Sequence, residues 1–250
     1  MTHPSIQPHP VVSREQWLAE RRKLLAREKD LMRQNDELAA ERRALPWVRV
    51  EKPYVFDGPQ GQQTLAGLFD GRSQLIVYHF MFAPGQKEGC VGCSFVADHI
   101  DGAMPHINAR DITVVVCSRA PLAQIEPFRR RMGWRFKWIS SNRSDFNSDY
   151  HVSFTKDDLA KGPTYYNFEK RSSPSEGEAP GLSVFYKDAT GEIFHTYSAY
   201  ARGLEVLDGA YHFIDLVPKG RDEEGLPFPG AWWRHHDRYA ADTIQARHAE

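Results

Sequence analysis

Two of the three cysteines in this chain of 250 residues, Cys90 and Cys93, are separated only by Val91 and Gly92. Cysteines at this spacing can form a redox-active disulfide or supply half of a metal site. They can also be two inert thiols of a hydrophobic core. The Cys-x-x-Cys pattern is a moderate signal by itself, so the elements that position the pair must decide among these three alternatives.

The cysteines lie between two apolar segments. Residues 74–82, QLIVYHFMF, form a nearly continuous apolar run, which is typical of a strand covered on both faces. Residues 93–107, CSFVADHIDGAMPHI, are compatible with a helix, and residues 111–118, DITVVVCS, with a second buried strand. A strand, a helix and a strand at this spacing predict two parallel strands joined by a right-handed crossover. The cysteines are therefore expected where the first strand ends and the helix begins.

This placement favours redox chemistry. The first turn of a helix offers unpaired N–H groups and a partial positive charge, which stabilise a thiolate and lower the pKa of the thiol. We expect Cys90 to be the nucleophile and Cys93, one turn further along, to resolve the mixed disulfide. A zinc site would need two more ligands, and only the adjacent pair His235 and His236 is eligible. We therefore predict no metal.

Two further residues of the apolar strands carry reactive groups. Cys117 ends the second strand, where the ordinary role of a free cysteine is a buried core thiol. Neighbouring parallel strands end at one edge of the sheet, so Cys117 is also expected near the Cys-x-x-Cys pair as an accessory thiol. His79 interrupts the first strand. It is either a satisfied core histidine or a proton carrier.

Residues 180–217 are regular again. PGLSVFYKDATGEIFHTYSAY predicts a hairpin preceded by Pro180, and RGLEVLDGAYHFIDLVP predicts a helix after it. Strict alternation along the second strand puts His195 and Tyr197 on one face and Ser198 on the other. One alternative is an edge strand with a polar face. The other makes Arg202 a positive group that steadies a thiolate or orients a peroxide or an acidic substrate.

The N-terminal part of the chain is predicted to be a tail and one long helix. Residues 1–12 are rich in proline, and a helix follows over residues 13–45, with Ser13 and Gln16 as a capping box. Large apolar residues recur in it with a period of seven: Trp17, Leu24, Leu31, Leu38 and Leu45. So narrow a stripe suits a helix that lies along the surface of its own domain, or one that serves as a dimer arm.

Composition excludes several classes of function. Apolar residues make up 41% of the chain and charged residues 26%, with 32 Lys and Arg against 33 Asp and Glu. The formal net charge of -1 gives no field that would gather nucleic acid or anionic lipid. No secretory signal and no apolar run long enough to span a bilayer is evident, and three cysteines make no disulfide framework. We expect a cytoplasmic protein whose C-terminal AWWRHHDRY segment docks on the core.

The segments QLIVYHF, EGCVGCSF, APGLSVFYKDATGEIFHTYS and YARGLEVLDGAYHFIDL together resemble the thioredoxin-like fold. Over residues 13–240 the chain resembles the thioredoxin-like family known as domain of unknown function 899, within the thioredoxin and peroxiredoxin-like superfamily. The resemblance implies a redox pair at Cys90 and Cys93, faced by Pro180, which is commonly cis in such folds. Thioredoxins usually have tryptophan where this chain has Gly89, and the Pro and Thr that precede the essential cysteine of peroxiredoxins are missing.

We therefore expect an α/β protein with a central mixed sheet and helices on both faces. The thioredoxin-like domain spans residues 46–220, with an insertion around 121–179, and a docking segment follows over 221–250. The predicted activity is thiol–disulfide exchange, extended to peroxide reduction, on a protein or small-molecule substrate with an external thiol reductant and no cofactor. The alternative is a redox-inert binding module that makes its contacts through the N-terminal helix. The candidate site residues are Cys90, Cys93, Pro180 and Arg202, with Cys117, His79 and His195 as accessory residues.

Overall fold

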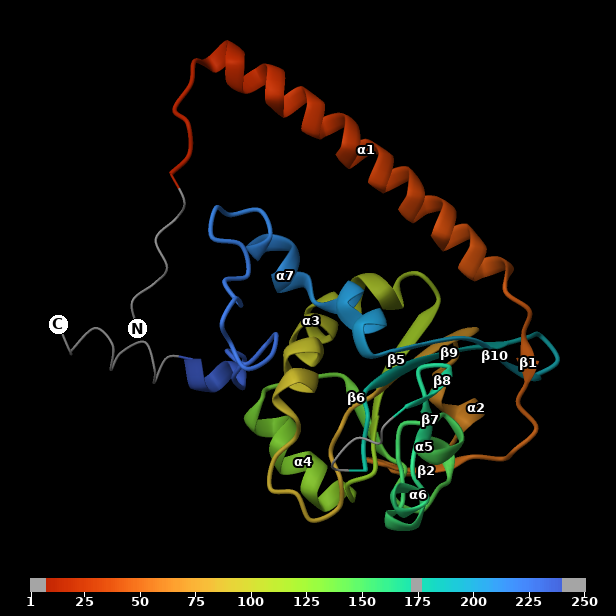
Figure 1. Cartoon of the computed structure of the whole chain (residues 1–250). Coiled ribbons are helices and arrows are strands. Elements are labelled where there is room, and N and C mark those ends of the chain that lie inside the picture. The colour runs from red at the N-terminus through yellow and green to blue at the C-terminus, as the bar shows by residue number, and fades with distance from the viewer. Residues whose placement is uncertain (1–7, 172–176, 240–250) are drawn as a thin grey trace.

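The structure, a computed structural model, describes residues 8–171 and 177–239 (Figure 1). Eight strands form the main sheet, in the order β1-β10-β9-β4-β5-β6-β2-β3. Their bounds are β1 (Val48–Arg49), β2 (Val55–Gly58), β3 (Gly61–Thr64), β4 (Gln74–His79), β5 (Ile112–Ser118), β6 (Lys137–Ser140), β9 (Gly181–Lys187) and β10 (Ile193–Tyr200). A separate hairpin joins β7 (Thr164–Tyr166) and β8 (Glu169–Arg171).

The predicted strand–helix–strand unit is confirmed. Strands β4 and β5 are parallel, paired from Gln74–Ile112 to His79–Cys117, and the helix between them is α3 (Val91–Asn108). The apolar composition of both strands follows from their central place in the sheet, because each is flanked by a strand on either side. Their carboxyl ends meet at one edge of the sheet, and the Cys-x-x-Cys segment begins there.

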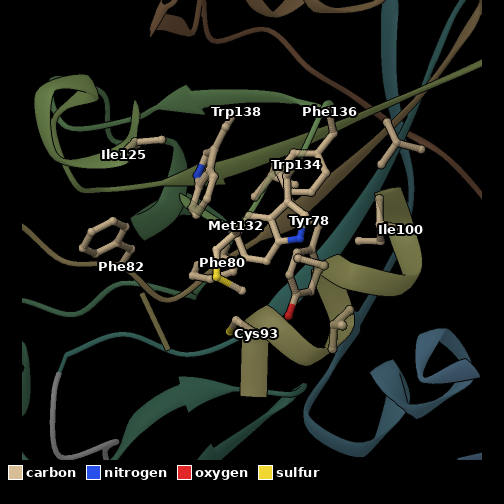
Figure 2. Close-up of a cluster of buried hydrophobic side chains, with 14 of the residues drawn as sticks. Tyr78, Phe80, Phe82, Cys93, Ile100, Ile125, Met132, Trp134, Phe136 and Trp138 are labelled. Carbon is tan, nitrogen blue, oxygen red and sulfur yellow. The ribbon is translucent and has the colours of Figure 1, made fainter. Parts of the chain in front are cut away.

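Helices cover both faces of the sheet. Helices α3 and α4 (Leu122–Arg131) pack on one face, over a core rich in aromatic rings that includes Tyr78, Phe80 and Trp138 (Figure 2). Helices α2 (Leu65–Leu68) and α5 (Phe146–Asp149) pack on the other face. The strand order β10-β9-β4-β5, with only β4 and β5 parallel, is the thioredoxin-like arrangement. The predicted fold class is confirmed.

The predicted hairpin forms, but one detail of it was wrong. Strands β9 and β10 are antiparallel, and their register shifts between His195 and Tyr197. A bulge of this kind inserts one unpaired residue and breaks the alternation of side chains. His195 therefore packs against the rings of Tyr150 and Phe185, whereas Tyr197 joins the core under α3. The two residues do not share a face, and β10 is not an edge strand because β1 pairs with it.

Helix α1 (Arg14–Ala44) begins with the predicted capping box of Ser13 and Gln16, and its C-cap, Leu45, directly precedes Pro46. None of its residues is buried, and it projects away from the sheet (Figure 1). The five apolar side chains that recur every seven residues are 44–56% exposed. The expectation that this helix lies along its own domain is therefore wrong. Its use as a dimer arm stays a prediction.

The remaining elements connect or extend this frame. They are α6 (Lys156–Ala160), η1 (Ala201–Leu207), α7 (Gly209–Ile214) and η2 (His236–Arg238). Within the segment expected to be an insertion, α4 is followed by β6, and β6 continues the main sheet next to β5. In the described ranges, no helix combines the length and the apolar character that crossing a membrane requires. The predicted tail is described only from residue 8, where the chain has no regular structure.

Candidate functional site

Both cysteines of the Cys-x-x-Cys pair lie at the start of α3. Cys90 is the N-cap, and its Sγ accepts a hydrogen bond from the backbone N–H of Cys93 at 3.5 Å. The Sγ of Cys93 in turn accepts from the backbone N–H of Met81 at 3.4 Å. Cys90 is partly exposed, whereas Cys93 is buried. The pair is unoxidised in this structure, and the outer thiol is the accessible one.

The two thiols differ in how readily they lose a proton. Burial raises the pKa of Cys93 well above its usual range, and the hydrogen bond and charge of Cys90 raise it further. The nearby hydroxyl of Tyr78 acts on this pKa in the opposite direction, but its effect is smaller. Burial therefore disfavours the thiolate form of Cys93. The backbone N–H of Cys93, in the first turn of α3, faces the sulfur of Cys90.

A cavity of about 830 Å³ opens over the cysteine pair. Apolar side chains dominate its walls, among them Met81, Val96, Leu204, Phe228 and Trp233. Two of the predicted site residues, Pro180 and Arg202, line the same cavity. The resemblance had implied a cis peptide bond before Pro180, and this bond is trans. The structure therefore brings four of the predicted residues together, with Pro180 in a different peptide geometry.

Arg202 lies at the rim of this cavity, and its charge is already paired. Its Nη2 is 2.8 Å from Oε2 of Glu205, and its side chain is 89% exposed. Arg221 also binds Glu205, at 2.7 Å. An exposed guanidinium that already binds a carboxylate has limited capacity to steady a thiolate. The role of Arg202 toward Cys90 stays a prediction.

The C-terminal segment covers the start of α3. The indole of Trp233 stacks on Phe95 of α3, with ring centroids 5.2 Å apart, and touches Gly92 between the two cysteines. His235 is buried, and its Nε2 lies 3.0 Å from the carbonyl oxygen of Gly89. The chain end thus supplies the aromatic surface beside the cysteines.

The packing around Gly89 explains why this chain has no tryptophan directly before its first cysteine, where thioredoxins usually have one. A Cβ atom at this residue would lie 2.5 Å from Cε1 of Phe80 and 2.8 Å from Cε1 of Phe128. No side chain fits there without moving two core rings. The backbone of Gly89 passes close over the aromatic core, and Trp233 supplies an indole at the site from elsewhere in the chain.

Cys117 is buried in the core, as the ordinary role of a free cysteine predicts, and the alternative that put it beside the Cys-x-x-Cys pair does not fit the structure. Successive side chains of a strand point to opposite faces, so Val116 faces α3 and Cys117 faces α5. Its Sγ lies 3.4 Å from Oδ1 of Asn147, and burial raises the pKa of the thiol to about 12. Cys117 is a buried core thiol on the far side of the sheet from Cys90.

His79 and His195 lie on this same opposite face. The Nε2 atoms of His79 and His195 lie 2.9 Å from Ser183 Oγ and 2.8 Å from Ser198 Oγ respectively, and the two hydroxyls are 3.1 Å apart. Burial lowers the pKa of His79 to about 3 and also lowers that of His195. Both rings are neutral at pH 7. The three predicted accessory residues therefore gather around a second buried polar cluster, away from Cys90.

Sequence reasoning missed two pocket residues. The buried hydroxyl of Tyr78, on β4, points toward Cys93 (Figure 2). Asp208, just before α7, is 7% exposed and lines the same cavity. Alternation along β4 places Tyr78 on the face opposite His79, so the sequence held a signal for it. Asp208 carries no comparable signal, because no periodic pattern in the sequence includes it.

A metal centre has no support in the part of the chain that the structure describes. No group of three or more His, Cys, Asp or Glu side chains there is arranged to hold an ion. His235 binds the Gly89 carbonyl, and Nδ1 of His236 lies 2.6 Å from Oδ1 of Asp98. The two histidines point to different partners, and neither binds a cysteine.

Similar folds occur among solved structures, at low identity. A mutant of peroxiredoxin Q from Xanthomonas campestris is 12% identical with a TM-score of 0.43, over 64% of this chain and 90% of the other. The peroxidoxin BcpB from Mycobacterium tuberculosis is 11% identical with a TM-score of 0.42, over 66% and 97%. No curated protein matches the chain. Residues 6–239 match the family described as "Bacterial protein of unknown function (DUF899)", and the chain therefore belongs to that family.

Proposed function

We propose that this protein is a thiol–disulfide oxidoreductase that uses Cys90 as its nucleophile and Cys93 as its resolving thiol. The observation that carries the proposal is the asymmetry of the pair at the start of α3. Cys90 is the accessible N-cap at the floor of a cavity, and Cys93 is buried behind it with a raised pKa. An accessible thiolate beside a protonated partner is what a two-step exchange needs.

The reaction with a disulfide then balances as follows. The Cys90 thiolate attacks one sulfur of the substrate, forms a mixed disulfide and releases the first substrate thiolate. Cys93 loses its proton and attacks the Cys90 sulfur, which releases the second substrate thiolate and leaves a Cys90–Cys93 disulfide. The substrate gains two electrons, and an external dithiol returns the protein to its reduced state.

We propose a hydroperoxide as an alternative oxidising substrate, beside a disulfide. The Cys90 thiolate attacks the outer peroxide oxygen, and with one proton from solvent this gives a sulfenic acid and an alcohol. Cys93 condenses with the sulfenic acid to the same disulfide and releases water. A cavity of about 830 Å³ with apolar walls is in the size range of sites for organic ligands. We therefore propose an organic hydroperoxide or disulfide in preference to hydrogen peroxide.

The setting that we propose for this activity is the cytoplasm, where a thiol reductant is available. A homodimer through α1 is also part of the proposal, because the five apolar side chains of its stripe are unburied in the single chain. The alternative of a redox-inert binding module rests on this same exposed stripe. A direct test of the thiols separates the two functions.

The test exposes the reduced protein to cumene hydroperoxide, hydrogen peroxide and glutathione disulfide, and maps the bonds that form by mass spectrometry. We expect a Cys90–Cys93 disulfide in the natural chain. In a Cys93→Ser variant, glutathione should stay attached to Cys90. The Cys90→Ser variant is the matched control and should form no adduct at Cys93. A natural chain whose Cys90 stays reduced with all three oxidants would favour the redox-inert module.

A further inference from the structure

Helix α1 carries an apolar stripe that the single chain leaves uncovered. The stripe consists of five side chains, each 44–56% exposed: Trp17, Leu24, Leu31, Leu38 and Leu45. At about 1.5 Å per residue, the 31 residues of α1 make a helix about 46 Å long. An exposed apolar surface of this length marks an interaction site, so the question is which surface covers it.

The base of α1 is fixed to its own domain. Trp47 packs against the rings of Tyr186 and Phe194, whose centroids are 5.1 and 5.8 Å from its own. Directly after Trp47, β1 pairs with β10. In the last turn of α1, the guanidinium carbon of Arg42 lies 5.8 Å from the ring centroid of Tyr197. Turning the helix back onto its own sheet would break these contacts, so the stripe is available to a second molecule.

The stripe does not suit pairing with a second α1. A two-stranded coiled coil needs a second apolar row, and the positions of that row hold Arg21, Glu28, Asn35 and Arg42. In a parallel pair of helices each charged residue of this row would face its own copy, and like charges repel. In an antiparallel pair the apolar row would face the polar row of the partner. A single narrow stripe suits instead a helix that lies on the apolar surface of a folded domain.

An apolar patch of this kind lies on α7 and the turn that continues it. Phe213, Leu216 and Val217 are 76%, 82% and 52% exposed, and we call these three residues the α7 patch. Their spacing of three and four residues puts them on one side of the element. Tyr211, two residues before Phe213, is buried on the other side. Apolar side chains that cluster and are exposed to this degree mark a contact surface.

The charges around the stripe and around the α7 patch are complementary. The N-terminal half of α1, residues 14–29, has six basic and three acidic side chains, a formal charge of +3. Residues 205–224, which include the α7 patch, have six acidic and two basic side chains, a formal charge of -4. Unlike charges on two apolar surfaces favour their contact and determine which surfaces meet. The net charge of -1 for the whole chain hides this separation.

We propose that two copies of the chain exchange arms, so that α1 of each copy lies on the α7 patch of the other. Each copy gives one arm and receives one, as a two-fold dimer requires. The stripe covers the α7 patch, and the basic half of α1 lies along the acidic segment. That segment also supplies Glu205 and Glu223 to the cavity over Cys90, so the partner's arm lies beside the mouth of this cavity. The arrangement rests on the homodimer of the proposed function and not on its thiol chemistry.

A photo-crosslinking probe on the stripe tests which surface receives the arm. In the full chain, p-benzoylphenylalanine replaces Leu24, and chains of natural and of heavy nitrogen isotope are mixed, irradiated and digested with trypsin. We expect mass spectrometry to find position 24 joined to the peptide of residues 203–219, which contains the α7 patch. Linked peptides that combine the two isotopes identify a contact between copies. The same probe in place of Ala26, on the opposite side of α1, is the matched control and should give no such product.

The mass of the protein in solution tests the α7 patch directly. Light scattering over about a hundredfold range of concentration should show a dimer, and Phe213→Asp and Leu216→Asp should each raise its dissociation constant by about 10-fold or more. Both side chains are exposed, so the fold of the single chain should be kept, which circular dichroism checks. Phe168→Asp is the matched control, because Phe168 is a 62% exposed ring in the turn between β7 and β8, and no effect on the dimer is expected.

Several results would overturn the exchanged arm. A product that joins position 24 to α1 of the other copy would mean a pair of helices, and one within a single chain would mean that α1 folds onto its own domain. A dimer without any product from position 24, or one that Phe213→Asp and Leu216→Asp leave unchanged, would also overturn it. A chain that is monomeric at every concentration would contradict the homodimer as well. The thiol chemistry is decided separately, by whether the Cys90–Cys93 disulfide forms.

Discussion

Trp233 lies directly over Gly92: a Cβ atom at Gly92 would come within 2.9 Å of Cζ3 of the indole. The two residues are far apart in the sequence, yet the indole covers the spacer between the nucleophile and the resolving thiol. The same ring stacks on Phe95, one turn further along α3, so it contacts two residues of this helix. The Cys-x-x-Cys segment is therefore built by the start of α3 and the end of the chain together.

This contact predicts opposite effects for two glycines of one helix. Ala in place of Gly within a helix usually stabilises by about 0.5–1 kcal/mol. Gly102→Ala should show this gain, because its added Cβ would meet nothing within 4 Å. Gly92→Ala should lose the gain and lower the free energy of unfolding, because the indole must move. Urea unfolding measures both variants. Equal stabilisation by the two substitutions would contradict the contact with Trp233.

Gly89 gives a second prediction about packing. Restoring a side chain there, as in Gly89→Ala, forces the rings of Phe80 and Phe128 apart. Overpacking of this kind typically costs about 1–3 kcal/mol. We expect a loss of this size in urea unfolding. Gly102→Ala is again the control, because its added Cβ meets nothing within 4 Å and its φ is not positive, unlike that of Gly133. If Gly89→Ala lowers the free energy of unfolding by less than a surface substitution does, the rings of Phe80 and Phe128 can adjust to the added methyl group.

A third prediction concerns Cys117. With its thiol buried among α5 residues and its pKa raised to about 12, it should resist iodoacetamide in the folded protein at pH 8. Cys117→Ala should leave the formation of the Cys90–Cys93 disulfide unchanged and lower the free energy of unfolding by about 1 kcal/mol. Peptide mapping after alkylation measures the first expectation. A disulfide between Cys117 and either other cysteine would contradict the placement on the opposite face.

The central part of the fold was predictable because its signals are local. The apolar runs of β4 and β5 and the turn before β10 each follow from a short stretch of sequence. Placing Cys90 at the N-cap of α3 needed only the order of these elements. A pair of cysteines at a helix start is therefore accessible to sequence reasoning.

The rest of the site depends on contacts between distant segments. The bulge after His195 carries no Gly or Pro, so nothing marks where alternation breaks. The alternative that put Cys117 beside the pair considered the edge of the sheet without its faces. Trp233 reaches the cavity only because the C-terminal segment folds back over α3. These contacts are tertiary, and no local periodicity encodes them.

The last prediction concerns stability and Asp208. Its pKa is about 7 in the folded chain and about 4 in the unfolded chain, so the folded state binds the proton more tightly. The protonated carboxyl of Asp208 therefore contributes fully to stability at low pH, and this contribution is lost as the pH rises from about 4 to about 7. Asp208→Asn cannot ionise, and its gain over the natural chain should be about 2–3 kcal/mol larger at pH 8 than at pH 5. Urea unfolding at both pH values measures the difference, with Glu223→Gln as the control. A gain that is equal at the two pH values would mean that Asp208 is not a buried carboxyl with a raised pKa.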